Sequence, residues 1–260
     1  MKKTLIFVAI LANLIFGIQG FSQISEKEFD KIVNEVSQEY DKGNKEKSVS
    51  ILKKNIEKYP SVILLKVFLG TLYDDIGKEN EGEKELNETV ELQKKYPYIS
   101  NDGKKYDIRI AIGNFYVAQE KYEKALRWFK EIDDKYMQEV PELKEYMIGY
   151  TNYKLENTEE AKKYLLKSYI KDKAGLSESL LGVIYDDEGN QKEALKWYLK
   201  AIEKGNLDAQ VNLGSLYVNL GDNEKALQLF RKSLEEAKKI KDDETIKEIQ
   251  DIIKDIESGN

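Results

Sequence analysis

Two pairs of adjacent carboxylates and one run of tyrosines are the side chains of this sequence best suited to contact a ligand. Asp74-Asp75 and Asp186-Asp187 each follow an aliphatic residue and a tyrosine, whereas Tyr146, Tyr150 and Tyr153 lie at helical spacing. The negative charge could hold a basic or amide-rich ligand, and tyrosine rings could stack on a peptide or a sugar. The carboxylates equally suit solvated helix ends, and the tyrosines equally suit packing between helices.

The composition argues against enzymatic chemistry. The chain has no histidine and no cysteine, so the commonest general base, the thiol nucleophile and the usual zinc ligands are missing. The run from Asp186 to Asn190 lacks the alternating ligand spacing of a calcium loop. Among 48 acidic residues, a pair of carboxylates suited to glycoside hydrolysis arises by chance. We therefore expect no enzyme, no metal and no cofactor, and a carboxylate-based hydrolase is the least favoured hypothesis.

A recurring spacing of twelve residues predicts the elements that position these side chains. The pairs are Gly70/Gly82, Gly113/Ala125, Gly149/Ala161, Gly182/Ala194 and Gly214/Ala226, with Val36/Ser48 at the same spacing. A bulky residue follows the second member of a pair by four positions, as in Phe129, Leu165, Tyr198 and Phe230. Small residues let two helices cross closely, and the bulky neighbour fills the remaining space. The pattern therefore predicts six antiparallel helical hairpins stacked as a solenoid.

The last two copies resemble tetratricopeptide repeats. They read SLLGVIYDDEGNQKEALKWYLKAIEKGN and VNLGSLYVNLGDNEKALQLFRKSLEEAKK, with a Leu-Gly-x-x-Tyr core, a glycine turn, Ala-Leu, an aromatic residue and a small residue. The stretches KALRWFKEI and EALKWYLKAIEKGNLDAQVNLGSLY are also similar to the Sel1 subclass. The resemblance covers about residues 25–240 and is strongest in the C-terminal half. It implies an all-α, right-handed superhelical solenoid that binds a protein or peptide in a concave groove.

The resemblance also implies that the first helix of each hairpin lines this groove. Groove-facing positions then lie one and four to five residues after the first member of each pair, with Tyr146 one turn earlier. The candidate binding residues are Tyr40, Asp41, Asp74, Asp75, Asn114, Tyr146, Tyr150, Tyr153, Asp186, Asp187 and Asn219. This set contains no Lys or Arg, so a basic segment would suit it. Each helix-end aspartate is expected to cost roughly a few tenths of a kcal/mol against the helix dipole, so its replacement by Asn should hold or raise stability.

The two ends of the chain carry different signals. Residues 1–22 begin Met-Lys-Lys and continue with a short apolar run, which is typical of a secretory signal peptide and too short for a membrane span; a retained anchor is the alternative. Five isoleucines at helical spacing over 242–260 predict a capping helix, apolar inside and polar outside. The repeat domain is expected over 23–241, with hairpins at about 26–59, 61–96, 105–137, 140–172, 175–205 and 207–240 and a turn or break at 101–103.

These features favour an exported, non-enzymatic scaffold in the bacterial periplasm or outside the cell. Without Lys2 and Lys3 the formal charge changes from −6 to −8, with 40 basic against 48 acidic residues, and this acidic balance argues against nucleic-acid binding. We expect a protein or peptide partner, membrane contact only through the signal peptide, and, by family analogy, a role in cell-envelope assembly. The alternative is a binder of cell-wall glycan or a small ligand that uses the tyrosines.

Overall fold

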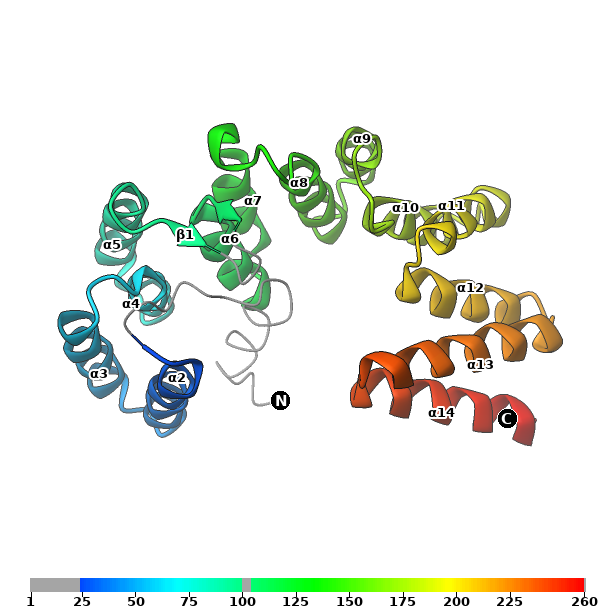
Figure 1. The fold of residues 1–260 in the computed structure, drawn as a ribbon, viewed down its shortest axis with the longest axis horizontal. Helices are drawn as coiled ribbons and strands as arrows, with labels where there is room; N and C mark the ends of the chain where they lie inside the picture. Colours follow the sequence, from blue (N-terminus) through cyan, green and yellow to red (C-terminus); the bar gives the residue numbers. More distant parts are fainter. Residues whose placement is uncertain (1–23, 100–103, 260) are drawn as a thin grey trace. The chain divides into compact units, whose positions relative to one another are not determined.

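The computed structural model describes residues 24–99 and 104–259, which form thirteen α-helices, one short 3-10 helix and one two-residue ladder (Figure 1). The expected signal peptide and the expected turn at 101–103 lie outside these described residues. The chain divides into two compact units, residues 1–144 and 145–260, which we call the N-terminal unit and the C-terminal unit. None of the described helices is long and apolar enough to span a membrane.

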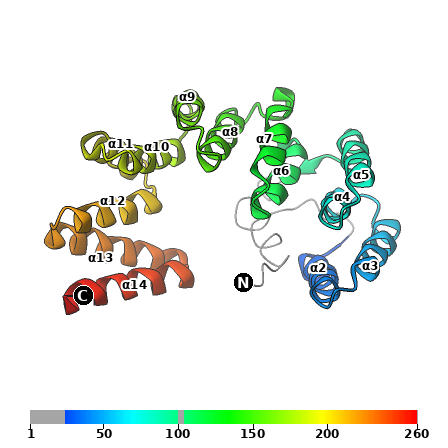
Figure 2. The same ribbon diagram turned by 180° about the vertical axis from the view of Figure 1, so that it is seen from behind.

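The N-terminal unit contains three helical hairpins (Figure 2). They are α2 (Glu26–Asp41) with α3 (Lys45–Lys58), α4 (Ile63–Asp75) with α5 (Glu79–Leu92), and α6 (Arg109–Ala118) with α7 (Tyr122–Lys130). Between the second and third hairpins, β1 (Tyr98–Ile99) pairs antiparallel with β2 (Lys105–Tyr106), and the 3-10 helix η1 (Asp134–Tyr136) follows α7. Helix α3 packs on α4, and α4 packs on α6, so consecutive hairpins stack within this unit.

The C-terminal unit contains the other three hairpins, apart from the first three residues of α8, and a final helix. They are α8 (Glu142–Lys154) with α9 (Thr158–Tyr169), α10 (Leu176–Asp187) with α11 (Gln191–Glu203), α12 (Leu207–Asn219) with α13 (Asn223–Ile240), and α14 (Asp243–Ser258). Helix α9 packs on α10, α11 on α12, and α13 on α14, where Ile249 is fully buried beside Ala226 and Phe230. The expected all-α fold of six hairpins and a C-terminal helix is therefore confirmed.

The glycines of the twelve-residue pairs lie where two helices cross. A Cβ atom added to Gly113 would lie 2.2 Å from the ring of Phe129, and one added to Gly182 would lie 2.4 Å from the ring of Tyr198. Gly70, Gly149 and Gly214 face Leu86, Leu165 and Phe230 in the same way. The bulky residue sixteen positions after each glycine therefore packs directly on it, as the sequence pattern predicted.

All six hairpins share one three-residue turn. Its middle residue lies seven positions after the first member of each pair and has a left-handed backbone conformation with positive φ. These residues are Gly43, Gly77, Glu120, Glu156, Gly189 and Gly221. The next amide donates to the carbonyl five residues before it, as Asn190 N does to Tyr185 O at 2.8 Å, which is a helix-ending motif. The residue that then caps the second helix occupies an equivalent place in every hairpin: Asn44, Lys78, Lys121, Asn157, Asn190 and Asp222.

Candidate functional site

In the N-terminal unit, four of the five candidate residues lie at the ends of α2 and α4, and three of these four form side-chain bonds. The Tyr40 hydroxyl donates a hydrogen bond to Asp75 Oδ2, which joins α2 to α4. Lys121 Nζ donates to Asp74 Oδ2 at 3.0 Å and to Asp75 Oδ1 at 3.4 Å, and Lys124 Nζ donates to Asp74 Oδ1. The Asp74 side chain is only 5% exposed. The chain's own lysines thus neutralise this acidic pair.

The electrostatics of Asp74 correct one expectation from the sequence. Burial raises the pKa of Asp74, but the hydrogen bonds from Lys124 and Lys121 outweigh it and hold that pKa below 3.8. Charge-assisted hydrogen bonds of this kind are stronger than neutral ones. These ion pairs contradict the premise that Asp74 is an unpartnered charge at a helix end, so we now expect Asp74→Asn to lower stability. The remaining candidates here are Asp41, exposed at the end of α2, and Asn114, half-buried on α6.

The C-terminal unit repeats the tyrosine–aspartate contact. The Tyr153 hydroxyl on α8 donates to Asp187 Oδ2 on α10 at 2.8 Å. Burial and this hydrogen bond together raise the pKa of Tyr153 to about 12. In both units the tyrosine lies four positions after the first member of its pair, and the aspartate lies five positions after that of the next hairpin. The equivalence with Tyr40 and Asp75 therefore makes this contact a feature of the repeat.

The other aspartate of this pair, Asp186, is placed like Asp74 but has different surroundings. Asp186 is half-buried, and burial together with the charge of Asp187 raises its pKa. Within the part of the chain that the structure describes, no ion pair or side-chain hydrogen bond involves its carboxylate. The residue at the position of Lys121 in the following hairpin is Asp222. The lysine that neutralises the N-terminal pair is thus replaced by an acidic residue.

The three candidate tyrosines of α8 pack toward α10. Tyr146, Tyr150 and Tyr153 are half-buried against a core cluster that includes Leu165 of α9, and the Tyr146 and Tyr150 ring centroids are 6.5 Å apart. Lys154 Nζ lies 5.6 Å from the centroids of both the Tyr150 and the Tyr153 ring. These rings therefore pack between helices and already have a cation over two of them. Asn219, the last candidate, is exposed at the end of α12.

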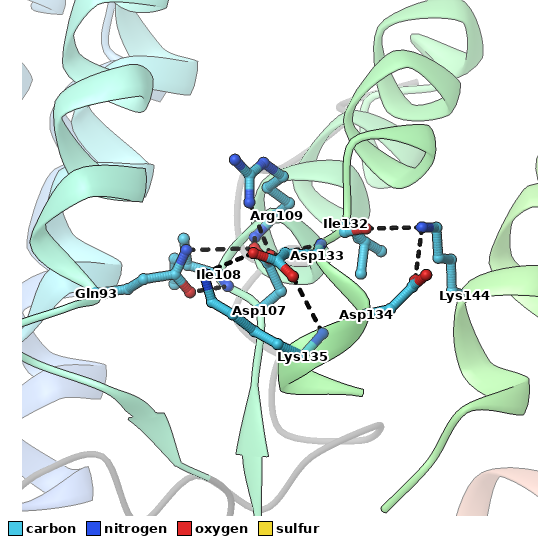
Figure 3. A network of polar contacts seen from close by, with 9 residues as sticks. All are labelled: Gln93, Asp107, Ile108, Arg109, Ile132, Asp133, Asp134, Lys135 and Lys144. Carbon is cyan, nitrogen blue, oxygen red and sulfur yellow. Dashed lines mark hydrogen bonds and ion pairs between the residues drawn. The ribbon is translucent and has the colours of Figure 1, made fainter. Parts of the chain in front are cut away.

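A buried carboxylate that the sequence did not single out ties together three segments of the N-terminal unit (Figure 3). Asp107 is fully buried; its Oδ1 accepts from the Arg109 amide at 2.9 Å, and its Oδ2 accepts from the Asp133 amide at 2.9 Å and from Arg109 Nη1 at 2.7 Å. Gln93, at the end of α5, bonds Asp107 through its amide nitrogen and accepts from the Ile108 amide. The carboxylate is thus saturated by its own chain and positions helices.

Neither unit gathers acidic side chains into a metal site within the described residues. Tyr40, Asp41, Asp74, Asp75 and Asn114 belong to the N-terminal unit, and the other six candidates belong to the C-terminal unit. The structure thus brings the candidates together as tyrosine–aspartate contacts between neighbouring hairpins. The sequence analysis did not single out Lys121 and Lys124. The repeat indicates that they lie at and near the start of a second helix, but it does not indicate that they bind Asp74.

The tetratricopeptide repeat family model matches residues 146–169, 179–203 and 207–240. These segments fall on the hairpins α8–α9, α10–α11 and α12–α13. The match supports a tetratricopeptide repeat family, as the sequence resemblance predicted, and it indicates no catalytic family. A comparison with curated proteins found no match for this chain.

Several solved structures are similar to this chain at low identity. PilW, described as a widely conserved type IV pilus biogenesis factor, is 11% identical, with 87% of this chain and 100% of that chain covered and a TM-score of 0.47. Pseudomonas aeruginosa PilF is 15% identical, with 85% and 96% covered and a TM-score of 0.45. YrrB, described as a TPR protein with an unusual peptide-binding site, is 22% identical, with 71% and 91% covered and a TM-score of 0.41.

Proposed function

We propose that this chain is an exported tetratricopeptide scaffold, without enzymatic activity, that binds a protein or peptide segment on one face of the C-terminal unit. We call this face the first-helix face and define it by Tyr153 of α8, Asp186 and Asp187 of α10, and Ser215 and Asn219 of α12. The family match on these three hairpins supports the proposal, because stacked hairpins offer a preformed surface that a partner segment can occupy with little rearrangement.

The observation that carries the proposal is the half-buried carboxylate of Asp186. Burial has removed part of its water, and no described side chain replaces that water with a hydrogen bond. A partly desolvated polar group is costly unless it gains a partner. Ser215 and Asn219, both exposed on α12, add further hydrogen-bonding groups to the same set of first helices. A segment with polar or basic groups gains more on this face than an apolar one.

The glycan-binding alternative depends on free tyrosine rings. Sugar stacking needs an accessible ring face, but Lys154 already lies over the Tyr150 and Tyr153 rings, and Tyr146 packs on the core cluster. A polypeptide that uses the carboxylate and amide groups fits this face better than a glycan. The similarity of some stretches to the Sel1 subclass does not favour a glycan over a polypeptide as the ligand.

Export is part of the proposal and is supported by the N-terminal sequence pattern, whereas the proposed role in cell-envelope assembly is based on family analogy. A cleaved signal peptide would leave a mature chain that begins near residue 21 or 23. N-terminal sequencing of the protein purified from envelope fractions tests this part. An intact Met1 in that fraction would contradict cleavage and point to the retained anchor.

Site-specific photo-crosslinking tests binding on the first-helix face. A benzophenone amino acid replaces Ser215 on α12 and, as a matched control, Leu199 on α11, which is 46% exposed. We expect an envelope partner that crosslinks from position 215, is displaced by an excess of unlabelled protein and does not crosslink from position 199. Equal crosslinking from both positions, or none from position 215, would reject the first-helix face as the binding surface.

A further inference from the structure

The two acidic pairs of this chain offer an internal comparison, because the repeat places them equivalently. Asp74 and Asp186 each lie four positions after the glycine at the helix crossing, Gly70 and Gly182. In the N-terminal unit the carboxylate of Asp74 binds two ammonium groups from the next hairpin, one of them from Lys121. This position in the repeat therefore binds cations, as the chain itself shows.

In the C-terminal unit, neither of the two equivalent positions supplies a cation to Asp186. The equivalent of Lys121 is Asp222, whose side chain accepts from the Lys225 amide at 3.1 Å. The equivalent of Lys124 is Lys225, whose Nζ donates to Asp222 at 2.7 Å and lies 5.1 Å from the Tyr217 ring centroid. Lys225 is thus present at the second position, but its ammonium group binds Asp222 and not Asp186.

The other ionisable groups that face Asp186 do not neutralise it either. On its own helix, Asp187 is acidic and bound by Tyr153 of α8. On α11, burial raises the pKa of Tyr198, with the charge of Asp186 as a further cause, so this phenol stays neutral and near the carboxylate. Lys154 of α8 lies over tyrosine rings. The surroundings of Asp186 therefore have a negative balance, which favours a cation supplied from outside the chain.

We propose that Asp186 binds a lysine or arginine side chain of the partner, which takes the place that the Lys121 ammonium group takes at Asp74. This inference rests on the proposed function and specifies its chemistry: the bound segment is basic and presents a cation to the end of α10. Asp187, held by Tyr153, adds negative charge beside the contact. An exposed salt bridge contributes little, but a half-buried carboxylate that regains a charge-assisted hydrogen bond contributes more.

A defined peptide tests the cation requirement. The probe is a fluorescein-labelled Gly-Ser dodecapeptide with two central lysines, and its matched copy carries both lysines acetylated on Nε. Fluorescence polarisation should show that the lysine peptide binds the wild-type protein more tightly than the acetylated copy, and that added salt weakens the difference. Equal polarisation for the two peptides, whether both bind or neither binds, would overturn the inference.

Three variants assign the effect to Asp186. Asp186→Asn should weaken binding of the lysine peptide by roughly three- to tenfold. Asp222→Lys should weaken it as well, because it restores the internal cation found at Lys121. The comparison is Asp222→Asn, which keeps a helix-capping side chain and adds no cation; because it also releases Lys225, it should weaken binding less than Asp222→Lys does. An unchanged affinity in Asp186→Asn, or equal losses in Asp222→Lys and Asp222→Asn, would contradict the assignment.

Nuclear magnetic resonance gives a readout that is independent of binding. Carbon-13 titration of the Asp186 carboxyl should show its pKa above the ordinary value in the wild type and a lower pKa in Asp222→Lys. The two proposals remain separable. A partner crosslinked from position 215 whose affinity is the same in Asp186→Asn would reject the cation site and leave the scaffold function standing. The absence of any such partner rejects the scaffold function, whatever the lysine peptide does.

Discussion

The hydroxyl of Tyr153 lies 2.8 Å from Oδ2 of Asp187 and bonds helix α8 to helix α10. The same contact joins Tyr40 to Asp75, a hairpin pair that belongs to the other unit. A tyrosine near the end of one first helix thus binds the carboxylate at the end of the next. This contact fixes neighbouring hairpins through a polar bond as well as through their apolar cores.

Removing the Tyr153 hydroxyl should weaken the contact between α8 and α10 without leaving a cavity in the hydrophobic core. Tyr153→Phe is expected to lower the free energy of unfolding of the C-terminal unit by about 0.5–1.5 kcal/mol, because a hydrogen bond to a charged acceptor is lost. The measurement is urea unfolding in a Trp128→Phe background, followed by the fluorescence of Trp197, which is buried in this unit. Tyr164→Phe, whose ring lies beneath Lys163 and Lys167, is the control and should change little. Equal changes in the free energy of unfolding for Tyr153→Phe and Tyr164→Phe would show that the Tyr153–Asp187 hydrogen bond does not stabilise the contact between α8 and α10.

Equivalent substitutions of Asp74 and Asp186 should have opposite effects. At neutral pH, Asp74→Asn should destabilise by about 1–3 kcal/mol, because two lysines lose a charged acceptor. Asp186→Asn should stabilise by roughly a few tenths of a kcal/mol, because an unfavourable charge at a helix end is removed. With Trp128→Phe and Trp197→Phe backgrounds, the remaining tryptophan reports on one unit at a time. Changes of the same sign would contradict the contrast drawn between the two carboxylates.

The pH dependence of these two effects follows from the direction of each pKa shift. The folded-state pKa of Asp74 lies below 3.8, so its stabilisation is complete above pH 3.8 and is lost as the pH falls through the folded value. The folded-state pKa of Asp186 lies above 3.8, so its penalty is complete above the folded value and disappears below pH 3.8. Both variants should therefore approach wild-type stability in acid.

The helix crossings were predictable from the sequence, whereas the charge pairs were not. Gly182 meets Tyr198 only sixteen residues later, and both positions recur in each hairpin, so their spacing reveals the contact. Lys121 lies 47 residues after Asp74, at a turn position that the other hairpins fill with Asn, Asp or Lys, so no period marks it as a partner. The Asp107 network likewise joins residues of three unrelated segments. Local, repeated packing leaves a sequence signature, but single long-range polar contacts leave none.

A glycine at a helix crossing should tolerate no added methyl group. Gly182→Ala is expected to destabilise by about 1–3 kcal/mol, because its Cβ would meet the Tyr198 ring at 2.4 Å. Calorimetry of Gly182→Ala with Tyr198→Leu, set against Tyr198→Leu alone, should show a smaller loss, since the ring is gone. Strictly additive losses would show that the ring is not the obstacle. Gly189→Ala is a contrasting case, because nothing lies within 4 Å and only its left-handed backbone opposes the change.

Helix α14 should protect the last hairpin from water. Deleting residues 242–260 removes the buried Ile249 and uncovers Ala226 and Phe230, so a lower melting temperature and self-association are expected. Melting curves and light scattering measure both effects. Glu257→Ala, which breaks only the exposed pair with Arg231, is the control. A truncated protein that stays monomeric and melts like the wild type would remove the capping role.

The saturated carboxylate of Asp107 links the opening of separate segments into one event. It holds the end of α5 through Gln93, the start of α6 through Arg109 and the turn after α7 through the Asp133 amide. If the turn after α7 separates from the rest of the unit, the buried carboxylate of Asp107 loses a hydrogen bond. The same carboxylate holds α5 and α6, so their packing is weakened as well. Stacked hairpins in general can fray one at a time from a free end. Here the second and third hairpins should instead open and close as a single cooperative block, with their amide protons exchanging together.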